Sequence, residues 1–250
     1  MLNMFKNRSA EQTRKFYEGL ASGEEQRGLW GKERRFNPDS IAAKPSVLKH
    51  FVPVVKRYLT REDRCLDLGC GPGGFLSLMA PFCGTIIGAD ITPSFVAECQ
   101  AMIDRNGISN ARAVLLEKGE LPFADGEFDK VVMIDTIHHL EEHERTLAEV
   151  IRVLRPGGLL LIFEPNILNP LLALLCVLDK NEHGLLGLGT FAAYRRLLGT
   201  AFHTELEEYN GVLVGPEGKA SIALADFVSK PKNWAFGWLS PKLFIAARKI

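Results

Sequence analysis

The sequence carries a run of glycines directly after a short apolar segment, an arrangement in which the backbone can close around a ligand. The run reads DLGCGPGG at residues 67–74, with glycines at Gly69, Gly71 and Gly73. Glycine adopts positive φ values without strain and lets a ligand approach the main chain closely. Because Gly69, Gly71 and Gly74 also satisfy G-x-G-x-x-G, a dinucleotide site and a simple tight turn both remain open.

A carboxylate follows the glycine run at the distance expected for a ribose ligand. Asp90 ends the next β-rich segment, about 20 residues further on, where a carboxylate can accept both hydroxyls of a ribose. An Asp at a strand end also commonly caps a helix, and Thr92-Pro93 favours a helix start. Asp90 therefore indicates an adenosine-containing cofactor without distinguishing NAD from any other.

Two adjacent histidines, His138 and His139, follow the fourth apolar segment. With an unperturbed pKa of about 6.5, either can take a proton from an acceptor. The alternative is that one packs under the loop while the other lies in solvent. Glu164, after the fifth segment, is a further candidate base, with a turn role equally open. Adjacent histidines generally point apart and no second ligand group has recognisable spacing, so we expect no metal site.

The elements that position these residues alternate in type. Apolar segments at 65–68, 85–90, 113–117, 130–134 and 159–163 are separated by helical stretches at 74–82, 93–106 and 142–154. Continuous apolar strands separated by helices are typical of a parallel sheet covered on both faces. The pattern predicts a doubly wound α/β domain.

The flanking regions differ from this core. Residues 1–60 show helical spacing, with a second helix predicted from Pro45 and a bend at Pro53. After Glu164 the alternation ends, and we expect a helix near 190–199, a strand near 205–214 and a last strand at 243–247. A strand that follows so irregular a segment is compatible with an antiparallel insertion.

The composition excludes several classes of protein. Lys+Arg and Asp+Glu are both 30 in 250 residues, so the basic excess of a nucleic-acid binder is missing. Five cysteines without a CxxC pair indicate reduced thiols. The start has no apolar signal region, and the longest apolar run, 171–178, is far shorter than the roughly 20 residues of a membrane span. We therefore expect a cytoplasmic protein.

Four motifs in 65–164, about two-fifths of the chain, resemble those of class I S-adenosylmethionine-dependent methyltransferases, specifically the UbiE-like group that acts on small molecules. LDLGCGPG at 66–73 matches the family's first motif, including the acidic residue before the glycines. EKGELPF at 117–123 followed by FDKVV at 128–132, DTIHHL at 135–140, and LRPGG at 154–158 are similar to the later motifs, in the family's order.

The resemblance implies S-adenosylmethionine as cofactor and assigns its contacts. Gly69, Gly71 and Gly73 would surround the methionine part, and Asp67 would hold the loop and the amino end. Asp90 would bind the ribose. The adenine would be contacted by Ile91, Glu117 and the backbone N–H of Lys118, with Ile134 also at the cofactor. The family's usual residues in place of Glu117 and Lys118 are Asp and Ala, so this chain departs from the pattern there.

The resemblance further implies a seven-stranded, mostly parallel, Rossmann-like sheet with an antiparallel last strand and a helical cap. We expect one domain over 1–250, with an N-terminal cap at 1–60, the cofactor core at 61–164, an acceptor-side cap at 165–241 and the final strand at 242–250. The apolar 165–241 segment favours a lipophilic small-molecule acceptor, and Trp234, Phe236 and Trp238 suit contact with a membrane surface.

Two other functions stay open on the sequence alone. A nicotinamide-dependent oxidoreductase shares the fold, but no Tyr-x-x-x-Lys is found, since Tyr194 has no lysine at that spacing. A non-catalytic protein that binds the cofactor and acts through a partner is compatible with every motif, because methyl transfer requires no obligatory nucleophile.

Overall fold

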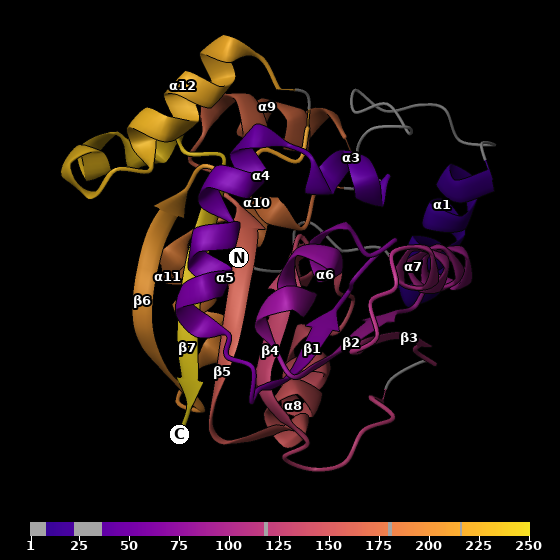
Figure 1. Ribbon diagram of the computed structural model, residues 1–250. Helices are drawn as coiled ribbons and strands as arrows, with labels where there is room; N and C mark the ends of the chain where they lie inside the picture. The colour runs from indigo at the N-terminus through magenta and orange to yellow at the C-terminus, as the bar shows by residue number, and fades with distance from the viewer. Residues whose placement is uncertain (1–8, 23–36, 118–119, 180–181, 216) are drawn as a thin grey trace.

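The computed structural model describes residues 9–22, 37–117, 120–179, 182–215 and 217–250, and its centre is one seven-stranded sheet (Figure 1). The strand order is β3-β2-β1-β4-β5-β7-β6. Strands β1 to β5 pair in parallel, and β7 runs antiparallel to both β5 and β6. The prediction of a doubly wound, mostly parallel sheet with an antiparallel last strand is confirmed.

The strands are β1 (Arg64–Leu68), β2 (Thr85–Asp90), β3 (Ala111–Leu115), β4 (Phe128–Ile134), β5 (Leu154–Pro165), β6 (Phe202–Asn210) and β7 (Lys242–Lys249). The helices are α1 (Ala10–Ser22), α3 (Pro38–Ala42), α4 (Pro45–His50), α5 (Val52–Tyr58), α6 (Gly74–Met79), α7 (Pro93–Arg105), α8 (His143–Val153), α9 (Pro170–Leu178), α10 (Leu185–Leu188), α11 (Phe191–Leu198) and α12 (Lys219–Val228). Short 3-10 segments are η1 (Ala80–Phe82), η2 (Ile137–His139) and η4 (Pro231–Leu239).

Side chains from the two faces of the sheet enter two separate apolar clusters. Along β4, Val132 and Ile134 pack with α4 to α7, whereas Val131 and Met133 pack with α8 and α11. Successive side chains of a strand point to opposite faces, so a strand covered on both faces must be apolar throughout. This requirement explains the continuous apolar segments of the sequence.

The strand order reverses at β1, because β2 and β3 lie on one side of it and β4 and β5 on the other. In open α/β sheets, ligands bind outside the carboxyl ends of the strands at such a reversal. The glycine run follows β1 directly, and residues 135–140 follow β4. The topology thus brings the predicted site residues to one edge of the sheet.

Several predicted strands have other bounds in the structure, and two of them are shifted along the chain. The strand expected at 113–117 is β3 at Ala111–Leu115, because its pairing with β2 begins at Ala111. The strand expected at 205–214 is β6 at Phe202–Asn210, a polar edge strand paired only with β7 among the described elements. Apolar content located these segments, but pairing with a neighbouring strand sets their ends. The bend expected at Pro53 is present as the break between α4 and α5.

Candidate active site

The glycine loop joins β1 to α6, and its three glycines have φ values of 78°, 52° and 93° at Gly69, Gly71 and Gly73. Residues other than glycine rarely adopt such positive φ values. A Cβ on Gly69 would lie 2.4 Å from Oγ1 of Thr136, and one on Gly73 would lie 2.7 Å from Sγ of Cys99. A Cβ on Gly71 would meet nothing within 4 Å. Gly69 and Gly73 therefore permit close packing, and Gly71 is where a ligand can reach the main chain.

Asp90 lies beside this loop at the end of β2. Its Oδ2 accepts a hydrogen bond from the Gly71 N–H at 3.0 Å, and its Oδ1 accepts one from the Thr92 N–H at 2.8 Å. Burial raises the pKa of Asp90, and these backbone N–H groups partly oppose that rise. Because a carboxylate oxygen can accept more than one hydrogen bond, Asp90 can hold the loop and the start of α7 and also bind a ribose.

Asp67 is buried in β1 directly before the loop, with a relative exposure of 2%. Its Oδ2 has no hydrogen-bond partner among the described residues. Burial, and secondarily the charge of Asp90, raises the pKa of Asp67 to about 8. A buried carboxyl oxygen without a partner is unfavourable, and a cationic group supplied by a ligand would relieve it.

A cavity of 360 Å³ opens at the carboxyl edge beside these residues. Its volume lies within the range of about 300–1,000 Å³ typical of small-molecule sites. Seven of the predicted site residues line it: Gly69, Gly71, Asp90, Ile91, Glu117, Ile134 and His139. Leu116 and Leu121 add apolar wall next to Ile91. The structure therefore brings together residues that are far apart in the sequence.

The remaining predicted residues are placed differently. Asp67, Gly73 and His138 do not belong to the cavity lining. Gly73 packs against α7 rather than facing the cavity. Lys118 falls outside the described residues, and its predicted contact with the adenine stays a prediction.

His138 is fully buried in a network of acidic side chains. Its Nδ1 bonds to Oε2 of Glu164, and its Nε2 lies 3.2 Å from Oε2 of Glu182. Burial lowers the pKa of His138, but the charges and hydrogen bonds of the two carboxylates outweigh it and raise that pKa to about 10. Such a group stays protonated at neutral pH while its surroundings are unchanged, so it is poorly suited to act as a base.

Glu164 holds this network together at the end of β5. Its Oε1 accepts the N–H groups of Thr136 and Ile137 at 2.8 and 2.7 Å, and its Oε2 accepts the Tyr194 hydroxyl at 3.2 Å. Glu164 therefore holds η2 in place through these contacts. The sequence patterns did not indicate that Glu182 and Tyr194 belong to this network, because neither residue lies in one of the four motifs.

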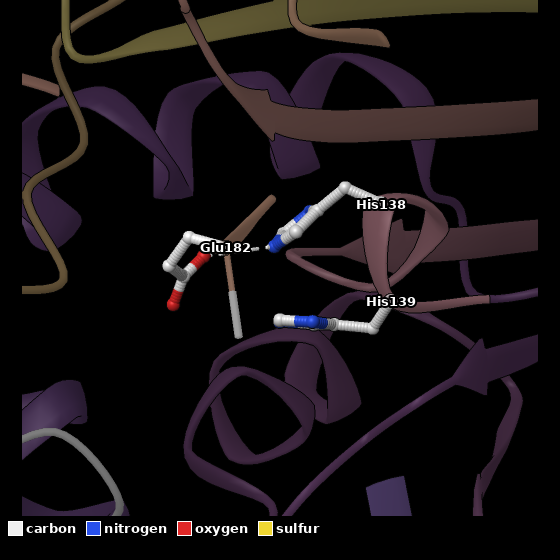
Figure 2. A group of neighbouring side chains, drawn as sticks. All are labelled: His138, His139 and Glu182. Atoms are coloured by element: carbon white, nitrogen blue, oxygen red, sulfur yellow. Dashed lines mark ion pairs between the residues drawn. The ribbon is translucent and has the colours of Figure 1, made fainter. Parts of the chain in front are cut away.

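The expectation that the two histidines point apart is wrong. Their ring centroids are 3.9 Å apart with an interplanar angle of 46°, because both lie in the tight turn of η2. Figure 2 shows the two rings side by side with Glu182 opposite them. Sequence spacing does not reveal Glu182, whose carboxylate comes from the segment between α9 and α10.

His139 is the histidine of this pair that reaches the cavity. It is partly exposed there, and its Nε2 lies 3.1 Å from the Tyr17 hydroxyl. Helix α1 is held over this region by two further contacts, since the Ala10 N–H donates to Glu141 and the Ser94 N–H donates to Glu18. Helix α1 therefore brings Tyr17 to the cavity.

Asp135, which sequence reasoning did not single out as a site residue, lies at the mouth of the site. It follows β4 with a φ of 52°, the only positive φ outside glycine among the described residues. It lines the cavity and pairs with the buried Lys242 of β7. Non-glycine residues in this conformation cluster at functional sites. The sequence signal for Asp135 is its position at the start of the DTIHHL motif, directly after β4.

These residues fit S-adenosylmethionine in three respects. The orphaned Oδ2 of Asp67, which lies directly before the loop but is not part of the cavity lining, would be satisfied by the cofactor's ammonium group. The open face of Gly71 admits the methionine part, and Asp90 offers carboxylate oxygens to the ribose. Apolar side chains at Ile91 and Leu121 provide surfaces for the adenine.

Comparison with known proteins supports this fit. Residues 66–162 match the family model of the methyltransferase domain. A probable S-adenosylmethionine-dependent methyltransferase of Mycolicibacterium smegmatis is 36% identical over 101 residues, covering 40% of this chain and 37% of that protein. The sterol 4-C-methyltransferase strm-1 of Caenorhabditis elegans is 29% identical over 110 residues, covering 44% and 33%. The chain thus spans about a third of the length of these curated relatives.

Solved structures agree in fold. Geranyl diphosphate C-methyltransferase from Streptomyces coelicolor A3(2), in complex with Mg²⁺, geranyl diphosphate and S-adenosyl-L-homocysteine, aligns with a TM-score of 0.59 and 16% identity, over 80% of this chain and 77% of that one. The [4+2]-cyclase SpnF aligns with a TM-score of 0.62 and 17% identity, over 98% and 97%. Identities this low show the shared fold alone.

The match to the model of the methyltransferase domain indicates S-adenosylmethionine as the cofactor of this site. The resemblance drawn from the four sequence motifs is confirmed, and the nicotinamide alternative loses its support. In its methyltransferase domain over residues 66–162, its glycine loop and its sheet topology, the chain is similar to class I S-adenosylmethionine-dependent methyltransferases.

Proposed function

We propose that this protein transfers a methyl group from S-adenosylmethionine to a lipophilic small molecule. The observation that carries the proposal is the single cavity in which Gly71 and Asp90 face the same space as His139 and Tyr17. The first two residues suit a cofactor, and the last two offer polar groups to an acceptor in the same space. Relatives with sterol acceptors in their names support a lipophilic substrate.

In this proposal the protein binds and orients, because the bound cofactor supplies an electrophilic methyl group. Asp67 and Asp90 fix the two ends of the cofactor, so its position relative to the sheet is set by two buried carboxyl groups. Tyr17 and Phe95, whose ring centroids are 5.5 Å apart, join α1 to α7 and exclude water from the cavity. Positioning and water exclusion account for most of what such a reaction asks of a protein.

The direct test is transfer of labelled methyl from S-adenosylmethionine into a lipid extract, followed by separation of labelled products. Asp90→Ala should strongly reduce labelling at cofactor concentrations that just saturate the unchanged protein. Asp104→Asn, an exposed change in α7, should leave the labelling unchanged. If the unchanged protein binds S-adenosylhomocysteine but labels neither lipids nor polar metabolites, the proposed activity is wrong and the non-catalytic alternative is favoured.

We infer that the acceptor is reached from a bilayer surface, through an apolar patch at the carboxyl edge. Helix α9 begins soon after β5 and contains only apolar residues, yet Leu171, Leu174 and Leu178 are 55–64% exposed. Trp234 and Trp238 of η4 are also exposed. Monomeric proteins rarely expose contiguous apolar surface of this kind without a binding partner.

The surroundings of the patch favour a lipid surface as that partner. The Asn169 side-chain N–H donates to the Leu239 carbonyl at 2.6 Å, so the start of α9 and the end of η4 form one continuous surface. Three exposed lysines lie in this region: Lys219 begins α12, Lys230 directly precedes η4, and Lys232 lies within η4. Leucines, interfacial tryptophans and lysines together match the apolar boundary and anionic headgroups of a bilayer. No helix within the described ranges is long and apolar enough to cross a membrane.

Sedimentation with vesicles tests this docking surface. We expect binding to vesicles that contain anionic lipid, weaker binding to purely zwitterionic vesicles, and a loss of about tenfold for Leu174→Ser, since an inserted leucine contributes about 1.5–3 kcal/mol. Leu115→Ser removes an exposed leucine from the distant strand β3 and should have no effect. Equal losses for both variants, no vesicle binding at all, or concentration-dependent self-association through the patch would overturn the inference.

A further inference from the structure

His138, His139 and Glu182 converge on one point at the wall of the cofactor cavity (Figure 2). The histidines come from η2, directly after β4, and Glu182 comes from the acceptor-side segment between α9 and α10. Each side chain offers one ligand atom, and these three atoms all lie within 4.8 Å of one another. His138 and Glu182 are buried, and His139 is partly exposed toward the cavity.

The separations suit a small divalent cation. The Nε2 of His138 and the Oε2 of Glu182 are 3.2 Å apart. Ligands at about 2.0–2.1 Å from a tetrahedral Zn²⁺ lie roughly 3.3 Å apart, so the separation of this pair matches that of two such ligands. A modest rotation of the His139 side chain, which is not packed on all sides, brings the third atom within range.

The orientation of His138 is fixed by a second carboxylate behind it. Its Nδ1 bonds to Glu164, whose position is in turn set by the N–H groups of Thr136 and Ile137. A carboxylate on one ring nitrogen directs the other nitrogen to a metal and strengthens it as a ligand. Glu164 would thus orient the His138 ring and strengthen its Nε2 as a ligand, as the carboxylate does in carboxylate–histidine–zinc arrangements.

The charge balance points the same way. Glu164 and Glu182 bring two carboxylates into a space where both are at most 7% exposed. A divalent cation would compensate both charges at once. Two imidazoles and one carboxylate form the His₂Glu set found in catalytic zinc sites, which keep one further position for water or substrate.

We propose that His138, His139 and Glu182 bind a divalent cation of the zinc class, which holds an acceptor through a hydroxyl oxygen beside the cofactor. This inference rests on the proposed function and names its acceptor class as an alcohol or phenol. A hydroxyl held by the cation loses its proton to solvent water more readily. Methyl transfer then forms the O–CH₃ bond and breaks the S–CH₃ bond, whose electron pair stays on sulfur as S-adenosylhomocysteine is formed.

The test uses the full chain, stripped with a chelator and titrated with Co²⁺ and Zn²⁺. We expect one equivalent of Co²⁺ to give the visible absorption of a four- or five-coordinate site, and Zn²⁺ to displace it. His139→Ala and Glu182→Gln should each weaken binding at least tenfold, and Glu164→Gln should weaken it by about 10–100-fold. His203→Ala, which removes an exposed histidine on β6, is the matched control and should bind as the unchanged protein does.

Two results would overturn the proposal. One is the lack of stoichiometric Co²⁺ or Zn²⁺ binding by the unchanged chain, which would leave His138 as a buried imidazolium between two carboxylates. The other is binding that His203→Ala weakens as much as His139→Ala. Because His139→Ala alters a partly exposed side chain, the comparison does not depend on the buried variants folding.

Calorimetry with S-adenosylhomocysteine on the same samples separates this inference from the proposed function. Cofactor binding without metal binding refutes the cation site alone. Metal binding without cofactor binding refutes the proposed methyl transfer.

Discussion

At the scale of single residues, the acidic side chains around the glycine loop define what the site can bind. Asp67 and Asp90 are both buried, and both have raised pKa values caused mainly by burial. Asp90 already accepts two backbone hydrogen bonds, whereas one oxygen of Asp67 has no partner among the described residues. The two carboxyl groups are therefore expected to respond differently to the ligand, Asp90 as a fixed acceptor and Asp67 as a group that ionises on binding.

Asp90→Ala should weaken binding of S-adenosylhomocysteine by about 1–3 kcal/mol, which is roughly 5–150-fold, because ribose hydroxyls lose a charged acceptor. Isothermal calorimetry measures the change, with Asp104→Asn as the control. Thermal unfolding of the same variants separates lost binding from lost folding. An unchanged affinity would show that Asp90 serves only the loop and the start of α7.

Ionisation of Asp67 makes ligand-free stability depend on pH. Its folded-state pKa of about 8 is above the unfolded value of about 3.9, so the stability this group contributes is fully present below about pH 4 and is lost as pH rises toward 8. At about pH 6.5, a bound ammonium group should drive proton release from Asp67. Calorimetry in two buffers of different ionisation enthalpy measures that release, which Asp67→Asn should abolish. Release that persists in this variant would refute the assignment.

At the scale of elements, the glycine loop and the 3-10 segment η2 were predictable to different degrees. The glycine spacing predicted the loop, since few other residues adopt its φ values. The expectation of no metal site instead depended on the general rule that adjacent histidines point apart. In the tight turn of η2 the two rings lie close together, so the rule does not hold there. Glu182 and Tyr194 join the site through tertiary packing of the cap, for which their own segments give no local signal.

Substitutions in the glycine loop should separate packing from binding. Gly69→Ala should lower the free energy of unfolding by more than the 1–2 kcal/mol of a left-handed conformation, because its Cβ would also clash with Thr136. Gly71→Ala has space for a Cβ, so it should cost less stability but should weaken cofactor binding through the filled cavity face. Denaturant unfolding and calorimetry measure the two effects. Equal stability losses would contradict this division.

Helix α1 should contribute to binding through Tyr17. Tyr17→Ala removes contacts with His139 and Phe95 at the cavity and should weaken S-adenosylhomocysteine binding several-fold. Lys15→Ala, on the exposed side of the same helix, loses only a surface ion pair with Glu11 and serves as the control. If both variants bind equally well, α1 does not close over the site.

At the scale of the whole molecule, the sequence predicted the sheet because continuous apolar strands require cover on both faces. The parallel pairing of β1 to β5 and the antiparallel β7 agree with the expected sheet. Strand ends were less accurate, since pairing partners rather than apolar content set them at β3 and β6. The predicted division into caps and core at 1–60, 61–164, 165–241 and 242–250 stays a prediction. Recognition of the acceptor depends on the cap at 165–241, which contains none of the four motifs.

The central claim is that the crevice at the carboxyl edge is built for an adenosyl sulfonium and its demethylated product. Calorimetric titration of the full chain with S-adenosylhomocysteine, and separately with NADH, tests it most directly. We expect single-site heat with S-adenosylhomocysteine that falls sharply in Asp90→Ala, and no heat with NADH. Heat with NADH that depends on Asp90, together with none from S-adenosylhomocysteine on folded protein, would contradict the account.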